Sequence, residues 1–128
     1  MLKKTHACFD VRIENKVAHI ILSRGDAMNT MTKDFWNELP AIVREIDAEA
    51  LARVIVISST GKHFSAGMDL SVFASDGSVS SKAADHYTAA EVFRSNIRQI
   101  QSSFNALEEA RIPVLIACQG GVIGGAID

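Results

Sequence analysis

Cysteine and proline are both scarce in this chain, which has two of each among its 128 residues. Cys8 and Cys118 stand far apart, with no Cys-x-x-Cys pair and no Cys/His spacing typical of a metal site. The sequence therefore predicts neither a disulfide framework nor a metal centre. Two reduced thiols in a cytosol-like compartment are expected instead.

Long apolar runs and an excess of one charge are also absent. No run approaches the length of a membrane span, and the opening MLKKTHACFDV contains no apolar stretch typical of a secretion signal. The formal net charge is −2, and the 13 Lys and Arg residues form no dense run. We therefore expect a cytoplasmic protein with no membrane span and no general attraction to nucleic acid.

What is present is the composition of a single globular domain, with 48% hydrophobic and 22% charged residues. Alternating or continuous apolar runs predict strands, and intervals of three and four predict helices. The predicted order is strand–strand–helix–strand–helix–strand, an α/β fold. The strands are expected at 9–14, 17–22, 54–58 and 114–117. The helices are expected around the stripes Phe35, Trp36, Leu39, Ile42, Val43 and Ile46, and Phe93, Ile97, Ile100, Phe104 and Leu107.

Some local expectations are more specific. Pro40 lies inside the first helical stripe, where it should bend or interrupt the helix. The strands at 54–58 and 114–117 are continuous apolar runs, which predicts cover on both faces. Residues 71–81 are rich in Ser, Gly and Asp and predict a mobile loop, and a helix should follow the last glycines.

Two stretches of small residues carry the chemistry. HFSAGMDL (63–70) follows one predicted strand, and CQGGVIGGAID (118–128) follows another with four glycines in six residues. The first amides of a helix are unpaired and carry partial positive charge, and small residues let a ligand oxygen approach them. Two such turns at one point would form an oxyanion hole, although one such turn alone is more often a matter of packing.

Other glycine-rich sites fit less well. A dinucleotide-binding GxGxxG pattern cannot be read from Gly120 onward, and the lysine of a Walker phosphate loop is missing. The spacing alone is thus consistent both with an anion-binding site and with an ordinary structural turn.

The two motifs, in this order, resemble those of the enoyl-CoA hydratase/isomerase (crotonase) family. The resemblance runs from about Phe9 to Asp128, the N-terminal half of that family's pattern, and SRGDAMNTM (23–31) resembles its first loop. Gly25 departs from it, since a proline is usual there. The resemblance implies a crotonase-like ββα spiral core, incomplete at the C-terminus, with residues 1–128 as the N-terminal part of an acyl-CoA-binding domain.

Site residues follow from the resemblance position by position. The amides of Ala66 and Gly125 would hold the thioester carbonyl oxygen of an acyl-CoA, whose coenzyme A is part of the substrate rather than a separate cofactor. The remaining binding positions implied are Asp26, Ala27, Gly67, Met68, Asp69, Leu70 and Gly121. Asp69 is equally consistent with a helix N-terminal cap.

Asp128 stands where hydratases of this family usually carry a glutamate, and an aspartate there is typical of Δ3,5-Δ2,4-dienoyl-CoA isomerases. The resemblance therefore favours an isomerase of fatty acid β-oxidation that moves double bonds through an enolate, with Asp128 as one acid/base group. Alternatives are an enoyl-CoA hydratase and a non-catalytic CoA-binding or assembly module, and Asp128 is also consistent with a helix cap. A homo-trimer or hexamer is implied for the complete protein, and a chain of these residues alone should expose an apolar patch.

Overall fold

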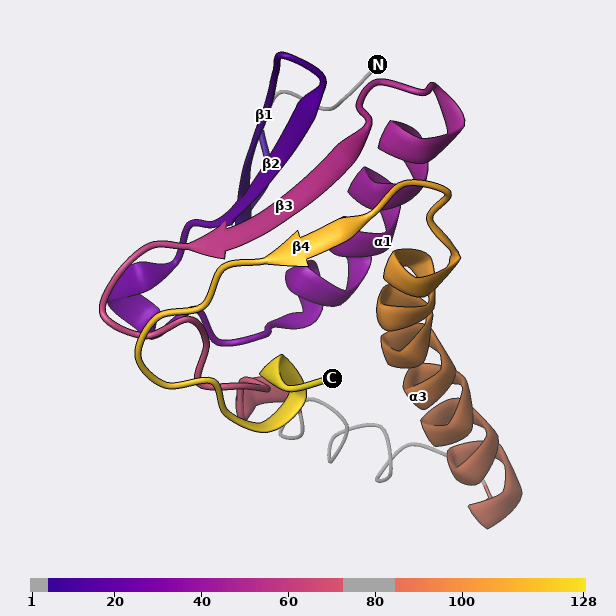
Figure 1. The fold of residues 1–128 in the computed structure, drawn as a ribbon. Helices are drawn as coiled ribbons and strands as arrows, with labels where there is room; N and C mark the ends of the chain where they lie inside the picture. The colour runs from indigo at the N-terminus through magenta and orange to yellow at the C-terminus, as the bar shows by residue number, and fades with distance from the viewer. Residues whose placement is uncertain (1–4, 73–84) are drawn as a thin grey trace.

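The computed structural model describes residues 5–72 and 85–128. A four-stranded sheet carries helix α1 on one face, and helix α3 lies beside α1 (Figure 1). The predicted order of strands and helices is confirmed. The elements are β1 (Phe9–Glu14), β2 (Val17–Leu22), the short 3-10 helix η1 (Gly25–Ala27), α1 (Lys33–Ala48), β3 (Val54–Ser59), α3 (His86–Glu109), β4 (Val114–Ile116) and the 3-10 helix η2 (Gly124–Ala126).

The sheet has the simple order β1-β2-β3-β4. A two-residue turn at Asn15 and Lys16, both with positive φ, joins the antiparallel strands β1 and β2. β2 is parallel to β3, and β3 is parallel to β4. Because β2, β3 and β4 all run the same way, their carboxyl ends lie at one edge of the sheet.

The core lies between the sheet and α1. Alternate residues of β2 and β3 are buried, including Ala18, Ile20 and Ile55, each with 0% of its surface exposed. They meet the apolar stripe of α1, which is buried as its spacing predicted; its buried residues are Phe35, Trp36, Leu39, Pro40, Ile42, Val43 and Ile46. Rings extend this core, with Phe9 on Phe35 at 5.1 Å between centroids and Trp36 edge-on to Phe104 at 5.6 Å.

Pro40 does not interrupt α1, which is continuous from Lys33 to Ala48. A proline removes the N–H that would bond the carbonyl four residues earlier. That carbonyl belongs to Trp36, and the hydroxyl of the fully buried Ser103 in α3 donates to it at 3.1 Å. The lost bond is thus replaced from a neighbouring helix.

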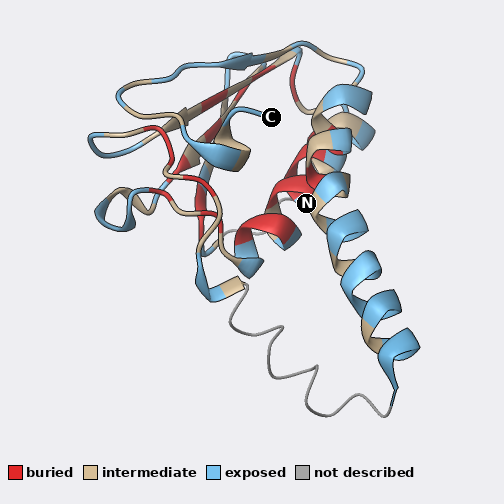
Figure 2. Ribbon diagram, turned by 90° about the horizontal axis from the view of Figure 1, so that it is seen from below, coloured by how far each residue is buried: buried red, intermediate tan, exposed pale blue. Residues whose placement is uncertain are grey.

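The long helix α3 is only partly covered. Ile100, Phe104 and Leu107 pack against the core, whereas Phe93 and Ile97 of the same predicted stripe are exposed. Figure 2 shows the exposed half projecting beyond the rest of the molecule. Its N-terminus is capped by Asp85, whose carboxylate accepts from the Thr88 N–H at 2.7 Å.

One prediction near the end of the chain is wrong. β4 is not covered on both faces, because it is the last strand of the sheet and the side chains of Leu115 and Ile116 are more than half exposed. The glycines 120–125 lead into the 3-10 helix η2, which begins at Gly124, where the sequence predicts a helix to begin. The loop predicted at 71–81 lies outside the described residues, except for Ser71 and Val72.

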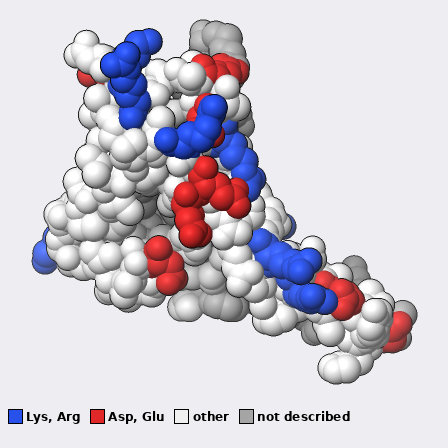
Figure 3. Space-filling view, turned by 45° about the vertical axis from the view of Figure 1, so that its right-hand side comes forward, with Lys and Arg blue, Asp and Glu red and all other residues white. Residues whose placement is uncertain are grey.

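Acidic and basic side chains are interspersed on the face of the molecule that Figure 3 presents. None of the helices in the described ranges is both long and apolar enough to cross a membrane.

Candidate active site

Three loops gather at one edge of the sheet because each leaves a parallel strand at its carboxyl end. Residues 23–31 follow β2, residues 60–70 follow β3, and residues 117–128 follow β4 (Figure 1). The carboxyl edge of parallel strands is where α/β proteins place their ligands. The sheet therefore brings together the three stretches that the sequence singled out.

The two motifs of small residues pair directly with each other. Ser65 and Val122 are parallel ladder partners. The Phe64 N–H donates to the Gln119 carbonyl at 2.7 Å, and the Ile123 N–H donates to the Ser65 carbonyl at 3.1 Å. Main-chain bonds thus fix one motif against the other.

Gly67 is required where the two turns touch. Its φ is +90°, and a Cβ built on it would lie 2.6 Å from the Ile123 carbonyl oxygen. Any side chain would therefore be strained in conformation and would collide with backbone that cannot move aside easily. The prediction that small residues here allow a close backbone approach is confirmed, and the approaching group is the second motif itself.

The loop after β2 forms the third side of this arrangement and decides which amides remain available. The Met31 N–H donates to the Gly67 carbonyl at 2.8 Å, and the Asp69 N–H donates to the Met31 carbonyl at 3.0 Å. The Ala66 N–H donates to the Met28 carbonyl at 3.0 Å. This bond contradicts the prediction that Ala66 supplies a donor, since its N–H is already used.

Two half-buried amides next to the contact are without a partner. In the described part of the chain, no hydrogen bond is made by the N–H of Met68 or the N–H of Gly125. Each follows a glycine at the point where Gly67 and Gly124 approach, with the Gly67 Cβ position 3.4 Å from the Gly124 Cα. A partly buried amide needs a partner, and a ligand oxygen is one that fits. Sequence reasoning placed the first donor at Ala66, two residues too early for this geometry.

Gly125 and Asp128 border a small apolar cavity of about 60 Å³ that reaches into the core. The cavity is lined by apolar side chains of the sheet, of both helices and of the loops after β2 and β3, among them Met31, Phe64 and Phe104. Asp128 itself is exposed. The structure thus places Asp128 and one of the two unpartnered amides on the same cavity.

Asp69 is held in its charged form. Its carboxylate accepts from the Ser71 N–H at 2.9 Å and from the Thr30 hydroxyl at 2.9 Å. These bonds, Ser71 first, lower the pKa of Asp69 to about 2. The bond to Ser71 is of the capping kind expected, and the bond to Thr30 ties the loop after β3 to the loop after β2.

The other predicted binding positions fall into two groups. Asp26 and Ala27 lie in η1 and are exposed, as is Leu70, so all three are accessible around the site. The Gly121 N–H instead donates to His63 Nδ1 at 2.8 Å, which makes its amide part of the framework. Gly67, Met68 and Asp69 stand at the contact already described.

The glycine at position 25, where the resemblance would place a proline, has a packing explanation. A Cβ on Gly25 would lie 2.9 Å from the Thr60 hydroxyl oxygen and 3.0 Å from the Gly61 nitrogen. The loops after β2 and β3 therefore approach each other too closely for a side chain there.

Asn29 and His63 organise the site and were not identified from the sequence. Asn29 is 2% exposed; its Nδ2 donates to the Thr60 carbonyl at 2.7 Å, and its Oδ1 accepts from the Arg24 N–H at 2.9 Å. Its φ of 49° is one that asparagine tolerates. A lone asparagine or histidine between turn residues gives no distinguishing sequence pattern.

Within residues 5–72 and 85–128, no group of three or more His, Cys, Asp or Glu side chains is placed to hold a metal ion.

Comparison with known proteins agrees with this arrangement. The model of the family described as enoyl-CoA hydratase/isomerase matches residues 12–128. The peroxisomal Δ(3,5)-Δ(2,4)-dienoyl-CoA isomerase of Arabidopsis thaliana is 34% identical over 115 residues, which is 90% of this chain and 41% of that protein. The human mitochondrial Δ(3,5)-Δ(2,4)-dienoyl-CoA isomerase is 37% identical over 115 residues, 90% of this chain and 35% of that protein.

Solved structures share the fold. An enoyl-CoA hydratase from Shewanella pealeana superposes with a TM-score of 0.83 at 19% identity, covering 97% of this chain and 43% of that one. An enoyl-CoA hydratase/isomerase from Mycobacterium paratuberculosis gives a TM-score of 0.76 at 26% identity, covering 95% and 45%. The expected crotonase-like α/β architecture is confirmed. This chain spans less than half the length of these relatives, and two of them are named peroxisomal and mitochondrial rather than cytoplasmic.

Proposed function

Because the chain belongs to the enoyl-CoA hydratase/isomerase family, we propose that the N–H groups of Met68 and Gly125 bind the carbonyl oxygen of an acyl-CoA thioester. The observation that supports this is the contact of two main-chain turns, each followed by a half-buried amide without a partner. Such donors stabilise the enolate that forms when a proton next to the thioester is removed, and each is worth about 2.7–4 kcal/mol in the transition state. Gly125 keeps the role predicted for it, and Met68 takes the role predicted for Ala66.

The reaction we propose is the isomerisation of a dienoyl-CoA, with Asp128 as one of the groups that move the proton. Asp128 lies three residues after Gly125 and lines the same small cavity, so it is near the thioester carbonyl that Gly125 is proposed to bind. The two dienoyl-CoA isomerases at 34% and 37% identity favour this reaction over hydration. Asp26, Ala27, Leu70 and Asp69 lie in the loops after β2 and β3 and are the positions proposed for the CoA portion. No separate cofactor is proposed, and a trimer or hexamer remains the proposed assembly.

Replacing Met68 by proline in the full-length protein tests the oxyanion site. Proline removes the unpartnered N–H without removing an existing bond of that amide. We expect the rate of conversion of a 3,5-dienoyl-CoA to the 2,4-dienoyl-CoA, followed by absorbance, to fall by about 10²–10³ in kcat. Met68→Leu, which keeps the N–H, should retain at least about ten times the activity of Met68→Pro.

The same assays distinguish the competing functions. Asp128→Asn should keep acyl-CoA binding and lose isomerisation, whereas a non-catalytic binding module would show binding and no turnover in the unmodified protein. Formation of a 3-hydroxyacyl-CoA from a 2-enoyl-CoA, in preference to isomerisation, would favour a hydratase. If folded Met68→Pro isomerises as fast as Met68→Leu, the amide of Met68 is not a donor.

A further inference from the structure

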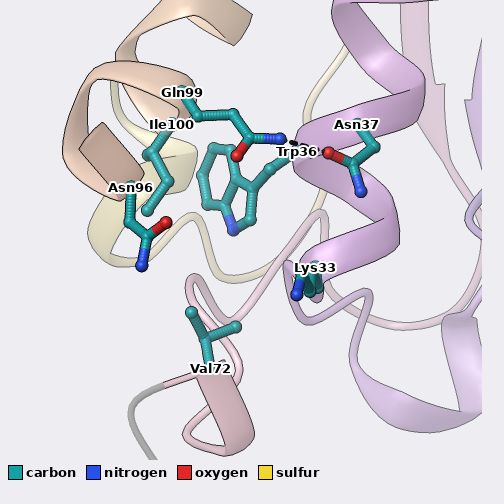
Figure 4. Close-up of a pocket in the computed structure, with 7 residues that line it drawn as sticks. All are labelled: Lys33, Trp36, Asn37, Val72, Asn96, Gln99 and Ile100. Carbon is teal, nitrogen blue, oxygen red and sulfur yellow. Dashed lines mark hydrogen bonds between the residues drawn. The ribbon is translucent and has the colours of Figure 1, made fainter. Parts of the chain in front are cut away.

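A second, more polar cavity of about 80 Å³ lies between α1 and α3. Figure 4 shows its seven lining residues, Lys33, Trp36, Asn37, Val72, Asn96, Gln99 and Ile100. Among the described residues, the lining contains one lysine and neither aspartate nor glutamate. The Gln99 side-chain amide donates to Asn37 Oδ1 across its upper wall. The local charge therefore favours a ligand that is negative or that accepts hydrogen bonds.

Trp36 gives this cavity an unused donor. The residue is only 3% exposed, and its Nε1 is buried with no hydrogen-bond partner. Figure 4 shows that nitrogen directed into the space bounded by Lys33, Val72 and Asn96. Indole Nε1–H donates and cannot accept, and a buried donor without a partner is costly. A ligand oxygen in the cavity would satisfy it.

The same indole ring adjoins the candidate active site. Its Cη2 atom lies 3.8 Å from the Cβ position of Gly125, so the ring separates that amide from the polar cavity. A third cavity of about 260 Å³ is lined by Met68 and by apolar side chains of α3, including Phe93 and Ile97. It shares Val72, Asn96 and Ile100 with the polar cavity. An apolar space beside Met68 thus adjoins a polar end at Trp36.

We propose that the polar cavity binds a terminal carboxylate on the acyl chain of the substrate, with Trp36 Nε1 and the Lys33 ammonium as its donors. This proposal rests on the proposed function, because it needs the thioester at Met68 and Gly125 and the methylene chain in the apolar space between. An uncharged methyl end would leave the indole N–H unpaired. A carboxylate end would accept hydrogen bonds from the indole N–H and from the Lys33 ammonium, which carries the opposite charge.

The test uses the full-length protein and two series of straight-chain acyl-CoA thioesters, one ending in a carboxylate and the other in a methyl group, matched in carbon number. We expect the carboxylate-ended thioester to bind at least about tenfold more tightly at the best chain length. Trp36→Phe keeps an aromatic side chain and removes the donor, so it should reduce that ratio about tenfold. Lys33→Gln should reduce it as well, whereas Lys16→Gln, an exposed lysine at the β1–β2 turn, should leave it unchanged.

The outcomes separate the two proposals. If neither series binds, the proposed function fails. If both series bind equally, or if folded Trp36→Phe keeps the full ratio, only the carboxylate subsite is overturned. Should Trp36→Phe fail to fold, the Lys33→Gln ratio decides, because that side chain is exposed and outside the core. An unchanged ratio in Lys33→Gln would then overturn the subsite.

Discussion

At the scale of single residues, the site depends on which main-chain amides the fold has already used. Ala66, Gly67, Met68 and Asp69 are consecutive, yet only the amide of Met68 is left without a partner. The Gly67 N–H donates to the Ser65 hydroxyl, and Ala66 and Asp69 donate to carbonyls of the loop after β2. Four similar positions therefore differ in their capacity to bind an oxygen, because Ala66 and Asp69 bond to a segment almost forty positions earlier and Gly67 bonds to Ser65.

Asp69 allows a prediction about acid stability. Its pKa in the folded chain is about 2, below the ordinary value of 3.8, because Ser71 and Thr30 donate to the carboxylate. A lowered folded pKa means that this stabilisation is present above the ordinary value and is lost as the pH falls from about 4 to about 2. We expect Asp69→Asn to flatten the dependence of unfolding free energy on pH within that window, measured by urea titration at successive pH values.

Asp26→Asn provides the matched comparison for Asp69, since it removes a carboxylate from the neighbouring exposed turn η1. It should leave the slope between pH 4 and 2 closer to that of the unmodified chain. Equal slopes in the two variants would show that the bonds to Asp69 do not contribute to acid stability.

Only some features of the site could be predicted from single residues of the sequence. The close approach at Gly67 and the donor proposed at Gly125 follow from small size and helix-start chemistry, which sequence records directly. The identity of the first donor does not, because it depends on whether the Met28 carbonyl bonds Ala66 or a later residue. Likewise, Asn29 is important because its side chain bonds the Thr60 carbonyl and the Arg24 N–H, and the residue type alone does not predict these partners.

At the scale of elements, α1 shows how a local conflict is resolved by a neighbouring helix. Its stripe of apolar residues predicts a helix, while Pro40 opposes one. The helix persists because Ser103 of α3 donates to the Trp36 carbonyl that Pro40 cannot serve. The apolar pattern was thus sufficient to predict the element, and the helix is not interrupted at Pro40 because of the compensating hydroxyl, which lies 67 residues away.

Ser103→Ala tests this compensation. Removing the hydroxyl leaves a buried carbonyl without a partner, so we expect a loss of about 1–3 kcal/mol in unfolding free energy measured by urea denaturation. Ser102→Ala, one position away and facing Arg44, should cost less, since that contact is exposed. In a Pro40→Ala background the residue 40 N–H again serves Trp36, so the Ser103→Ala loss should shrink. The same loss in both backgrounds would contradict the compensation.

Element by element, the strands were predicted most closely where one local pattern decides them. The alternation in β1 and the buried run in β3 give the observed strands to within one residue. The apolar run also predicted β4 but not its exposure. A continuous apolar run indicates that a strand suits burial on both faces, and it does not say whether the described residues cover both faces.

At the scale of the whole molecule, the chain has an asymmetric distribution of apolar surface. The face of α3 that carries Tyr87, Phe93 and Ile97 is exposed, and so are Leu115 and Ile116 on the edge strand β4. The N-terminal half of α3 projects from the molecule, and the outer edge of β4 is unpaired in the described residues (Figures 1 and 2). Exposed apolar side chains on an open strand edge favour association with other chains.

A polypeptide of these 128 residues should therefore self-associate. We expect sedimentation velocity to show a weight-average mass that rises with concentration, and the combined variant Phe93→Gln, Leu115→Gln to reduce that rise by removing apolar area from both surfaces. Met28→Gln changes an exposed apolar side chain outside both surfaces and should have a smaller effect. A monomer at every concentration, with helical and strand content retained by circular dichroism, would mean that these surfaces do not drive association. An association unaffected by the combined variant would place the contact elsewhere on the molecule.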